Sequence, residues 1–546
     1  MQFRATESNR FHAFHLRWWP AVAIAIVGVA GSAAVQAGFL QISSRPAVDS
    51  LLIAATAGLL LAAWIALFAP VRLIARAQLL AVMAALQVVA LLSIRLEGFA
   101  GDGRMILVWR WTPRVETHWE QPANPASGET AVRADPVDLS TVRPHDWPAF
   151  RGADRSGTIA GAHLTRDWRS DSPRLLWRRK VGAGWSSFAV VGRYCVTQEQ
   201  RGEWETVVCY ELHTGRECWT HADRTCFSEG TGGDGPRATP AIHDGRVYTL
   251  GATGVLNCLD GATGRRLWQV NILADAGVAN APFGMAGSPL VKDGMVVVAP
   301  GGRGSALVAY HAGTGQRLWR GGNGAAAYSS PHATEFGFSP NSRLAASAAR
   351  GSILNFNAAG LSAHDPSDGS LLFFLPWVTP PEDNNVCQPV PLPAMTDDAI
   401  GAVLISSGYG CGAALMDVVP EGAGWTIRER WRSRRLRAKF TSLVVRDGFA
   451  YGLDENKLTC LDLATGERCW LGGRYGWGQV LLAGDLLLVQ AEPGDVVLVE
   501  ATPEEHRELA RLPALRQRTW NHPALAGNIL LVRNDREAAC YQLGVR

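Results

Sequence analysis

The stretch KLTCLDLATGERCW, residues 457–470, decides the fold because the chain repeats it with small variations. The close copies are NCLDGATGRRLW (257–268), VCYELHTGRECW (208–219) and AYHAGTGQRLW (309–319), and more divergent copies occupy 363–374, 414–431 and 499–509. Self-similarity at a period of roughly 40 to 50 residues is typical of an array of small supersecondary units. The chain is therefore expected to stack such units in series.

Each copy predicts a β-hairpin that ends in a large aromatic residue. An apolar, β-prone run reaches an Asp or an equivalent, a Thr-Gly turn supplies the positive φ that glycine accepts, and a second short strand follows. A terminal tryptophan buries a large area while its indole N–H still finds a carbonyl, so it is suited to docking one unit on the next. The motif positions are Thr214, Gly215, Trp219, Asp260, Thr263, Gly264, Trp268, Thr314, Gly315, Trp319, Asp462, Thr465, Gly466 and Trp470.

A second series of motifs gives an independent count of the units. Between successive hairpins the chain starts a new strand through a small or polar residue, often followed by proline. The eight starts are WSSFAVV (185), ATPAI (238), GSPLV (287), SSPHA (329), CQPVPL (387), FTSLVV (440), WGQVLL (477) and NHPAL (521). Eight four-stranded units of this period predict an all-β, eight-bladed β-propeller. The alternative is a two-sheet all-β protein whose hairpins are similar by accident.

The N-terminal part predicts a membrane anchor. Three nearly uncharged segments are each long enough to cross a bilayer as a helix: residues 18–40, 51–70 and 77–94. Arg4, Arg10 and Arg17 precede the first segment, so the positive-inside rule places residues 1–17 in the cytoplasm and the chain after Ile94 on the far side. The expected location is the inner membrane, with the propeller outside the cytoplasm. A cleaved signal peptide and buried core helices are the alternatives.

The propeller is expected to span residues 147–546, after a linker at 95–146 whose residues 117–143 are rich in Pro, Ala, Ser and charge. Residues 175–181 (LLWRRKV) form a strand that precedes the first complete blade and needs a sheet. The C-terminus ends with only two or three strands of a last blade. We expect the early strand to complete that blade, because closing the ring removes an exposed sheet edge.

All ten cysteines lie between Cys195 and Cys540, in the part expected outside the cytoplasm, where disulfides are permitted. A four-residue loop ending at Gly215 or Gly466 would place two pairs directly opposite each other across their hairpins: Cys209 with Cys218, and Cys460 with Cys469. These pairs are interpreted as disulfide staples or as small apolar core residues, with a redox switch as the functional alternative. Cys387 and Cys411 are a weaker pair.

CLDLATGERCW and CLDGATGRRLW resemble the tryptophan-docking repeat of quinoprotein alcohol and glucose dehydrogenases and of the outer-membrane-protein assembly factor BamB. These proteins form the PQQ-like family of eight-bladed propellers, named after pyrroloquinoline quinone (PQQ). The resemblance covers about residue 147 to the C-terminus. Its WPAFRG, GPRATPAI and TWNHPALAG motifs are similar to a BamB-like bacterial branch of the family. Such a resemblance implies fold more strongly than function.

A PQQ dehydrogenase would need calcium held by carboxylate and amide oxygens, an Asp base and basic groups for the carboxylates of the quinone. The adjacent cysteines that many members place against the quinone are missing here. Asp260 and Asp462 lie at hairpin turns, where bonding to nearby backbone explains them. No catalytic residue and no metal ligand is assigned from the sequence. PQQ and calcium are expected only if the chain is an enzyme.

The residues that start the innermost strands are expected to point toward the central axis. They would offer cationic and aromatic groups to a planar anionic ligand, or would only fill the channel. The candidates are Trp185, Arg237, His332, Gln388, Lys439, Trp477, Trp520 and His522.

Other chemistries receive little support. The 13 histidines show no close pair with metal-ligand spacing and an acidic partner, and the Gly-rich segments lack the setting of a phosphate loop. The net charge of +3 does not indicate a nucleic-acid partner. The basic run at 428–437 is interpreted as a solvated blade edge, with a membrane or anionic-polymer contact as the alternative.

The sequence thus favours a membrane-anchored propeller that binds protein partners through loops and strand edges and is not an enzyme. A membrane quinoprotein dehydrogenase is the second hypothesis.

Overall fold

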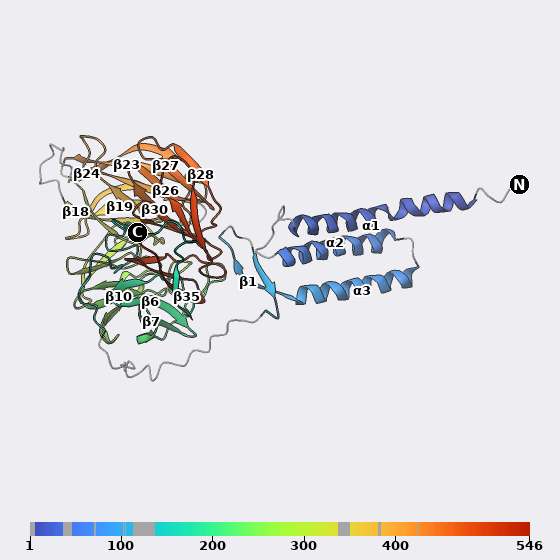
Figure 1. Cartoon of the computed structure of the whole chain (residues 1–546), viewed down its shortest axis with the longest axis horizontal. Coiled ribbons are helices and arrows are strands. Elements are labelled where there is room, and N and C mark those ends of the chain that lie inside the picture. Colours follow the sequence, from blue (N-terminus) through green and yellow to red (C-terminus); the bar gives the residue numbers. More distant parts are fainter. Residues whose placement is uncertain are drawn as a thin grey trace. The chain divides into compact units, whose positions relative to one another are not determined.

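The computed structural model describes residues 6–36, 46–69, 72–101, 103, 105–112, 137–336, 350–379, 384–422 and 424–546 (Figure 1). The chain forms two compact units, an N-terminal unit and a β-propeller unit, and each is described by itself.

The N-terminal unit contains three helices and one hairpin. The helices are α1 (Thr6–Gln36), α2 (Pro46–Phe68) and α3 (Leu73–Leu92), and the hairpin pairs β1 (Ile94–Phe99) with β2 (Met105–Trp109). The helices lie side by side in Figure 1, and the close approach of Gly28 on α1 to Ala57 on α2 leaves no room for a larger side chain. The strand β2 lies within the expected linker, of which residues 102, 104 and 113–136 fall outside the described residues.

Two of the described helices, over Asp49–Phe68 and Leu73–Leu92, are long and apolar enough to cross a membrane. The expectation of three membrane spans is therefore confirmed only in part. The first helix is longer than the expected segment, but its apolar stretch covers only Trp19–Val35. The third helix ends at Leu92, and Ile94 already belongs to β1.

The described part of the propeller unit forms eight sheets, seven of four antiparallel strands and one with a fifth strand that pairs in parallel. The blades, in chain order, are β5 (Ala189–Val191), β6 (Tyr194–Arg201), β7 (Trp204–Glu211) and β8 (Glu217–Asp223); β9 (Ala241–His243), β10 (Arg246–Leu250), β11 (Val255–Asp260) and β12 (Arg266–Asn271); β13 (Leu290–Lys292), β14 (Met295–Val298), β15 (Leu307–His311) and β16 (Arg317–Gly321); β17 (His332–Phe336), β18 (Arg350–Asn357), β19 (Gly360–His364) and β20 (Leu371–Pro376); β21 (Val390–Leu392), β22 (Gly401–Ser407), β23 (Gly412–Glu421) and β24 (Gly424–Ser433); β25 (Val444–Arg446), β26 (Phe449–Asp454), β27 (Lys457–Asp462) and β28 (Arg468–Gly472); β29 (Gln479–Ala483), β30 (Leu486–Gln490), β31 (Val496–Glu500) and β32 (Glu508–Leu512), with β3 (Thr158–Ile159) added; and β33 (Ala524–Ala526), β34 (Ile529–Arg533), β35 (Glu537–Gln542) and β4 (Arg174–Lys180). A short helix, α4 (Ile272–Ala276), follows β12. The prediction of an eight-bladed propeller is confirmed.

The strand β4 pairs with β35, so a strand from early in the chain completes the last blade, as expected. The first strands of several neighbouring blades contact one another, including β33 with β5, which closes the ring. Arg533, buried at the end of β34, donates to Thr197 Oγ1 and to the Gln198 carbonyl of the first blade, both at 2.8 Å. Figure 1 shows β35, from the end of the chain, near β6 and β7.

The Thr-Gly turns follow the predicted chemistry. In the second blade the Asp260 Oδ1 atom accepts from the backbone N–H and the hydroxyl of Thr263, at 2.9 and 2.8 Å. Gly264 has a φ of +73°, which a residue with a Cβ adopts only under strain. A β-bulge follows the turn, so Cys258 faces Trp268 while Leu259 faces Arg266. The same bulge recurs in all eight blades.

Tryptophans at the position after the bulge dock six of the eight blades on the turn of the next. Trp219 donates from Nε1 to the Gly261 carbonyl at 2.9 Å, and its ring lies directly over Gly264. Equivalent bonds run from Trp177 to Leu212, Trp268 to Ala312, Trp319 to Pro366, Trp431 to Leu463 and Trp470 to Thr502, at 2.7 to 2.9 Å. The predicted docking role of the repeated indoles is therefore confirmed.

Two seams use another residue at this position. In the fourth blade it is Phe373, and there β20 packs against β24 while Arg432 lies over the ring of Trp377 at 4.4 Å. In the seventh blade it is Ala510. The next blade is the composite one, whose two outer strands, β35 and β4, come from opposite ends of the propeller and share no turn. A docking indole there would therefore have no hairpin turn to dock on.

Candidate functional site

Around the axis, the small polar residues that start the innermost strands form a hydrogen-bonded belt between blades. All of them are buried. From blade to blade, a backbone N–H donates to the side chain of the next start: Ser187 to Thr239, Thr239 to Ser288, Ser288 to Ser330, Ser330 to Gln388 and Gln388 to Ser442, at 2.9 to 3.3 Å. The Gln479 amide continues the belt to the Phe440 and Trp520 carbonyls, and the Ser187 hydroxyl closes it on the His522 carbonyl. The second sequence series therefore marks the residues that join the ring.

The segment at 145–159 crosses the axis beside this belt and is called the axial strap. It pairs with the first blade through Trp147 and Val190, and with the seventh through β3. Arg151 and Arg155, both with φ of 60°, are almost completely buried within it. Buried charges need full hydrogen bonding, because desolvation penalises them strongly.

The two arginines of the axial strap bind backbone carbonyls of distant blades. Arg151 donates to Leu443 at 2.6 Å, and Arg155 donates to Ser288 at 3.2 Å and to Pro331 at 2.7 Å. Burial lowers the pKa of Arg151 to about 10 and that of Arg155 to about 9, so both keep a positive charge at neutral pH. The strap therefore links three blades across the axis.

Four of the predicted axial residues, Trp185, Lys439, Trp477 and Trp520, gather in one group, here called the aromatic cluster, with Phe440 and Arg518. The rings of Trp185 and Trp520 lie 5.0 Å apart, and the Arg518 guanidinium stands over both at 4.9 and 4.5 Å. Lys439 Nζ lies 5.1 Å from the Phe440 ring and 5.7 Å from that of Trp477.

One carboxylate, Glu492, holds two tryptophans of the cluster. It accepts from Trp520 Nε1 at 2.8 Å and from the backbone N–H of Trp477 at 3.3 Å. Arg237 donates to the Gly233 carbonyl at 2.7 Å, and its guanidinium lies 4.7 Å from the Phe227 ring. Burial lowers the pKa of Arg237 to about 10.

The other predicted axial residues lie at the level of the belt and the strap. Gln388 is part of the belt. Burial lowers the pKa of His332 to about 3, and the charges of Arg155 and Arg151 act in the same direction. Burial, together with the charge of Arg151, lowers the pKa of His522 well below its ordinary value. Both imidazoles are therefore neutral at physiological pH. The predicted single ring thus separates into two levels, because the chosen residues occupy different positions along their strands.

Sequence reasoning did not assign Arg151, Arg155, Arg518 or Glu492 to the axis. Their signal was present in part, since the WPAFRGADRSG motif contains both strap arginines. Their burial depends on carbonyls far away in the chain, which no local pattern reveals.

The predicted cysteine pairs are adjacent, but they are not directly opposed, and this expectation was wrong. The four-residue turn is as expected, because Glu211 N–H donates to the Arg216 carbonyl. The bulge then shifts the register by one residue, so Cys209 faces Trp219 and Cys460 faces Trp470. All ten cysteines are free thiols in the structure, and Cys387 and Cys411 bind separate carbonyls, of Gln388 and Val378.

The basic run at 428–437 lies mainly on β24, and most of its guanidinium groups are paired with acids. Arg430 and Arg428 bind Asp417, and Arg437 binds Asp454 at 2.7 Å. This agrees with a solvated, ion-paired blade edge.

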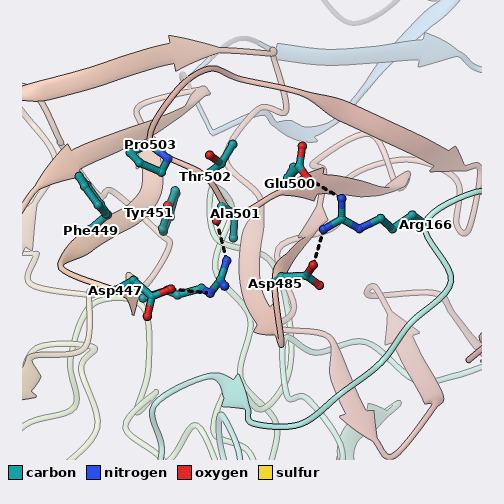
Figure 2. A pocket seen from close by; sticks show the side chains of 10 residues that line it. Arg166, Asp447, Phe449, Tyr451, Asp485, Glu500, Ala501, Thr502 and Pro503 are labelled. Carbon is teal, nitrogen blue, oxygen red and sulfur yellow. Dashed lines mark hydrogen bonds and ion pairs between the residues drawn. The ribbon is translucent and has the colours of Figure 1, made fainter. Parts of the chain in front are cut away.

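A surface pocket of about 290 Å³ lies between the sixth and seventh blades (Figure 2). Arg166 reaches between Asp485 and Glu500, and Arg446 binds the Ala501 carbonyl at 2.9 Å. Because these charges pair with one another, the pocket is best explained as an ionic clamp between blades.

The residues present do not fit the calcium-bound quinone that the family resemblance implies. Within the described ranges, no three His, Cys, Asp or Glu side chains come close enough together to hold a metal ion. The aromatic cluster contains one carboxylate, Glu492, and it already binds two N–H groups. Asp260 and Asp462 are both engaged in their turns, as the sequence indicates.

Comparisons with known proteins agree with this architecture. Residues 203–471 match the family described as outer membrane protein assembly factor BamB. The chain is 27% identical over 218 residues to a quinohemoprotein alcohol dehydrogenase of Comamonas testosteroni, and 30% identical over 101 residues to a 1-butanol dehydrogenase (cytochrome c) of Thauera butanivorans. These matches cover 36% and 18% of the chain, but only 28% and 14% of those relatives.

The crystal structure of quinohemoprotein alcohol dehydrogenase from Comamonas testosteroni superimposes with a TM-score of 0.54 at 15% identity, covering 75% of this chain and 82% of that one. At this identity the likeness concerns the fold. Together with the repeats, the docking tryptophans and the eight blades, the family match shows that the chain belongs to the PQQ-like, BamB-like family of eight-bladed β-propellers.

Proposed function

We propose that the protein is a non-catalytic binding scaffold, a propeller held at the inner membrane by its N-terminal helices and displayed outside the cytoplasm. The observation that carries this proposal is that the axial strap and its buried arginines occupy the axis of the ring. The strap arginines bind carbonyls of three blades there, so the centre of the ring serves as structural core. Partner binding is then left to the outer surface of the blades.

Three consecutive blades offer such a surface at their outermost strands. β12, β16 and β20 carry the exposed apolar side chains Leu267, Leu318, Leu371 and Phe374. Outermost strands keep one edge free of pairing within their own sheet, and a partner strand can add to it through main-chain hydrogen bonds. A partner segment with alternating apolar residues fits this rim, in the manner of an envelope assembly factor.

Site-specific photo-crosslinking in intact cells tests the scaffold. A photoreactive residue at Leu318 is expected to capture a discrete partner, whereas one at the solvent-exposed Asp368, in a turn, is expected to capture none. Equal labelling from both positions would contradict the proposal. A protease added to spheroplasts should digest the propeller, and full protection would contradict its placement outside the cytoplasm.

A membrane quinoprotein dehydrogenase is the second candidate, favoured by the relatives and by one feature of the aromatic cluster. The Trp477 Nε1 donor is buried and has no hydrogen-bond partner among the described residues, beside the cation of Lys439. Titration of the purified chain with PQQ and calcium distinguishes the two candidates. A bound chromophore and dye reduction with alcohols would establish the enzyme, and neither is expected for the scaffold.

A further inference from the structure

Four blades place a cysteine opposite the docking tryptophan. The pairs are Cys209 with Trp219, Cys258 with Trp268, Cys460 with Trp470 and Cys540 with Trp177. In each blade one further residue, immediately before the tryptophan, is the extra residue of the bulge. It is Cys218 in the first blade and Cys469 in the sixth, but Leu267 in the second and Leu176 in the eighth.

A bulge sets two residues of one strand against a single residue of its neighbour. The extra residue therefore lies beside the opposed cysteine. In the first blade the Cys218 thiol is close enough to Cys209 to help raise its pKa, and in the sixth the Cys469 thiol does the same to Cys460. Cys209 and Cys460 are buried, Cys218 is half-buried and Cys469 is exposed. Each pair thus combines one accessible thiol with one protected thiol.

The thiols of the first pair differ in acidity. Interaction with the Cys209 thiol lowers the pKa of Cys218, whereas burial raises the pKa of Cys209 well above its ordinary value. Because the thiolate is the nucleophile, the accessible Cys218 reacts first with an oxidant from solution.

We propose that Cys209–Cys218 and Cys460–Cys469 are two redox-active pairs that form disulfides across their bulges, and that the other six cysteines stay reduced. The oxidant is a reactive disulfide, either of a thiol-oxidising protein or of oxidised glutathione. The Cys218 thiolate attacks one sulfur of that disulfide and releases a thiolate. Cys209, losing its proton, then attacks Cys218 in the mixed disulfide and releases the second thiol. Two electrons and two protons leave with the oxidant.

Each bridge would fix the bulge that aims a docking indole. Trp219 and Trp470 follow Cys218 and Cys469 directly, and they dock the first blade on the second and the sixth on the seventh. Oxidation is therefore expected to tighten these two seams.

Peptide mapping of the purified full-length chain tests the proposal. The protein is equilibrated with glutathione and its disulfide over a range of ratios, quenched with N-ethylmaleimide and digested with trypsin without reduction. Arg216 and Arg468 lie between the members of the pairs, so each bridge joins two separate peptides: 202–216 with 217–224, and 458–468 with 469–474. Both linked pairs are expected, with a loss of about 2 Da per bridge.

The second blade provides a matched control. Cys218→Leu copies its natural arrangement and should abolish only the first bridge. Leu267→Cys should create a third one, between peptide 247–265 and the peptide that starts at residue 267. Retention of N-ethylmaleimide on Cys209 and Cys460 at every glutathione ratio, or bridges that join other cysteines, would overturn the proposal.

Acid trapping of the thiols in intact cells tests the proposed location separately from the proposed cysteine pairing. Bridges that form in the purified chain but are absent in cells would contradict the placement outside the cytoplasm, and would leave the pairing intact.

Discussion

Trp219→Phe should measure what one docking indole contributes to the ring. Trp219 is 3% exposed, and its Nε1 atom donates to the Gly261 carbonyl at 2.9 Å. Phenylalanine cannot donate, so the carbonyl loses its partner at a cost of about 1–3 kcal/mol. The smaller ring also loses buried area, which adds about 1 kcal/mol. We expect a loss of about 3 kcal/mol in the free energy of unfolding.

For a propeller of roughly 400 residues, this loss corresponds to a decrease of about 3–4 °C in the melting temperature. Thermal denaturation followed by near-ultraviolet circular dichroism is suitable, because it reports on packed indoles. Trp204→Phe is the matched control, since Trp204 is half-buried and contacts Arg224 at 6.0 Å without docking on a turn. Equal shifts for both variants would refute the docking argument.

Gly264→Ala extends this test to the partner of the indole. A Cβ at Gly264 would lie 2.5 Å from the Trp219 ring, at a φ of +73°. Part of the cost of this variant is therefore the clash with Trp219, which a smaller ring relieves. The double variant should lose less stability than the two single losses added, by about 0.5 kcal/mol or more. Strict additivity would show that the two residues do not act as a unit.

Three further predictions concern other parts of the propeller. Burial raises the pKa of Glu205 to about 7, so between pH 4.5 and 7 the folded state binds more protons than the unfolded state and the free energy of unfolding falls as the pH rises. Glu205→Gln should flatten this pH dependence in urea titrations and stabilise the protein by about 3 kcal/mol at pH 8. An unchanged pH dependence would contradict the raised pKa. Ser288→Ala leaves the buried Thr239 N–H unpaired and should lower the free energy of unfolding in chemical denaturation by about 1–3 kcal/mol. A negligible change would disprove the stabilising role of the belt. Arg155→Met removes the hydrogen bonds of the strap to Ser288, Pro289 and Pro331 and should lower the free energy of unfolding by at least about 3 kcal/mol. The exposed control Arg169→Met should lower it by under about 0.5 kcal/mol. Similar losses would show that the strap does not link the blades.

The sequence by itself determined the features that depend on neighbouring residues. An Asp, a Thr-Gly pair and an aromatic residue a few positions later fix a turn, a positive φ and an outward indole, so the blades could be counted. The unpaired strand at 175–181 and the incomplete last blade likewise predicted how the ring closes. The polar starts of the innermost strands were found as a pattern, although their role was not.

Only the tertiary structure decided what these residues contact. The bulge after each turn adds one residue to the outer strand, and a shift of one residue changes every cross-strand pair. Cys209 therefore faces Trp219 and not the expected Cys218. The belt joins residues of different blades, and Arg151 binds a carbonyl 292 residues away. Such contacts arise from the closure of the ring. Local sequence specifies each turn, but the burial of a charge at the axis depends on all the blades that surround it.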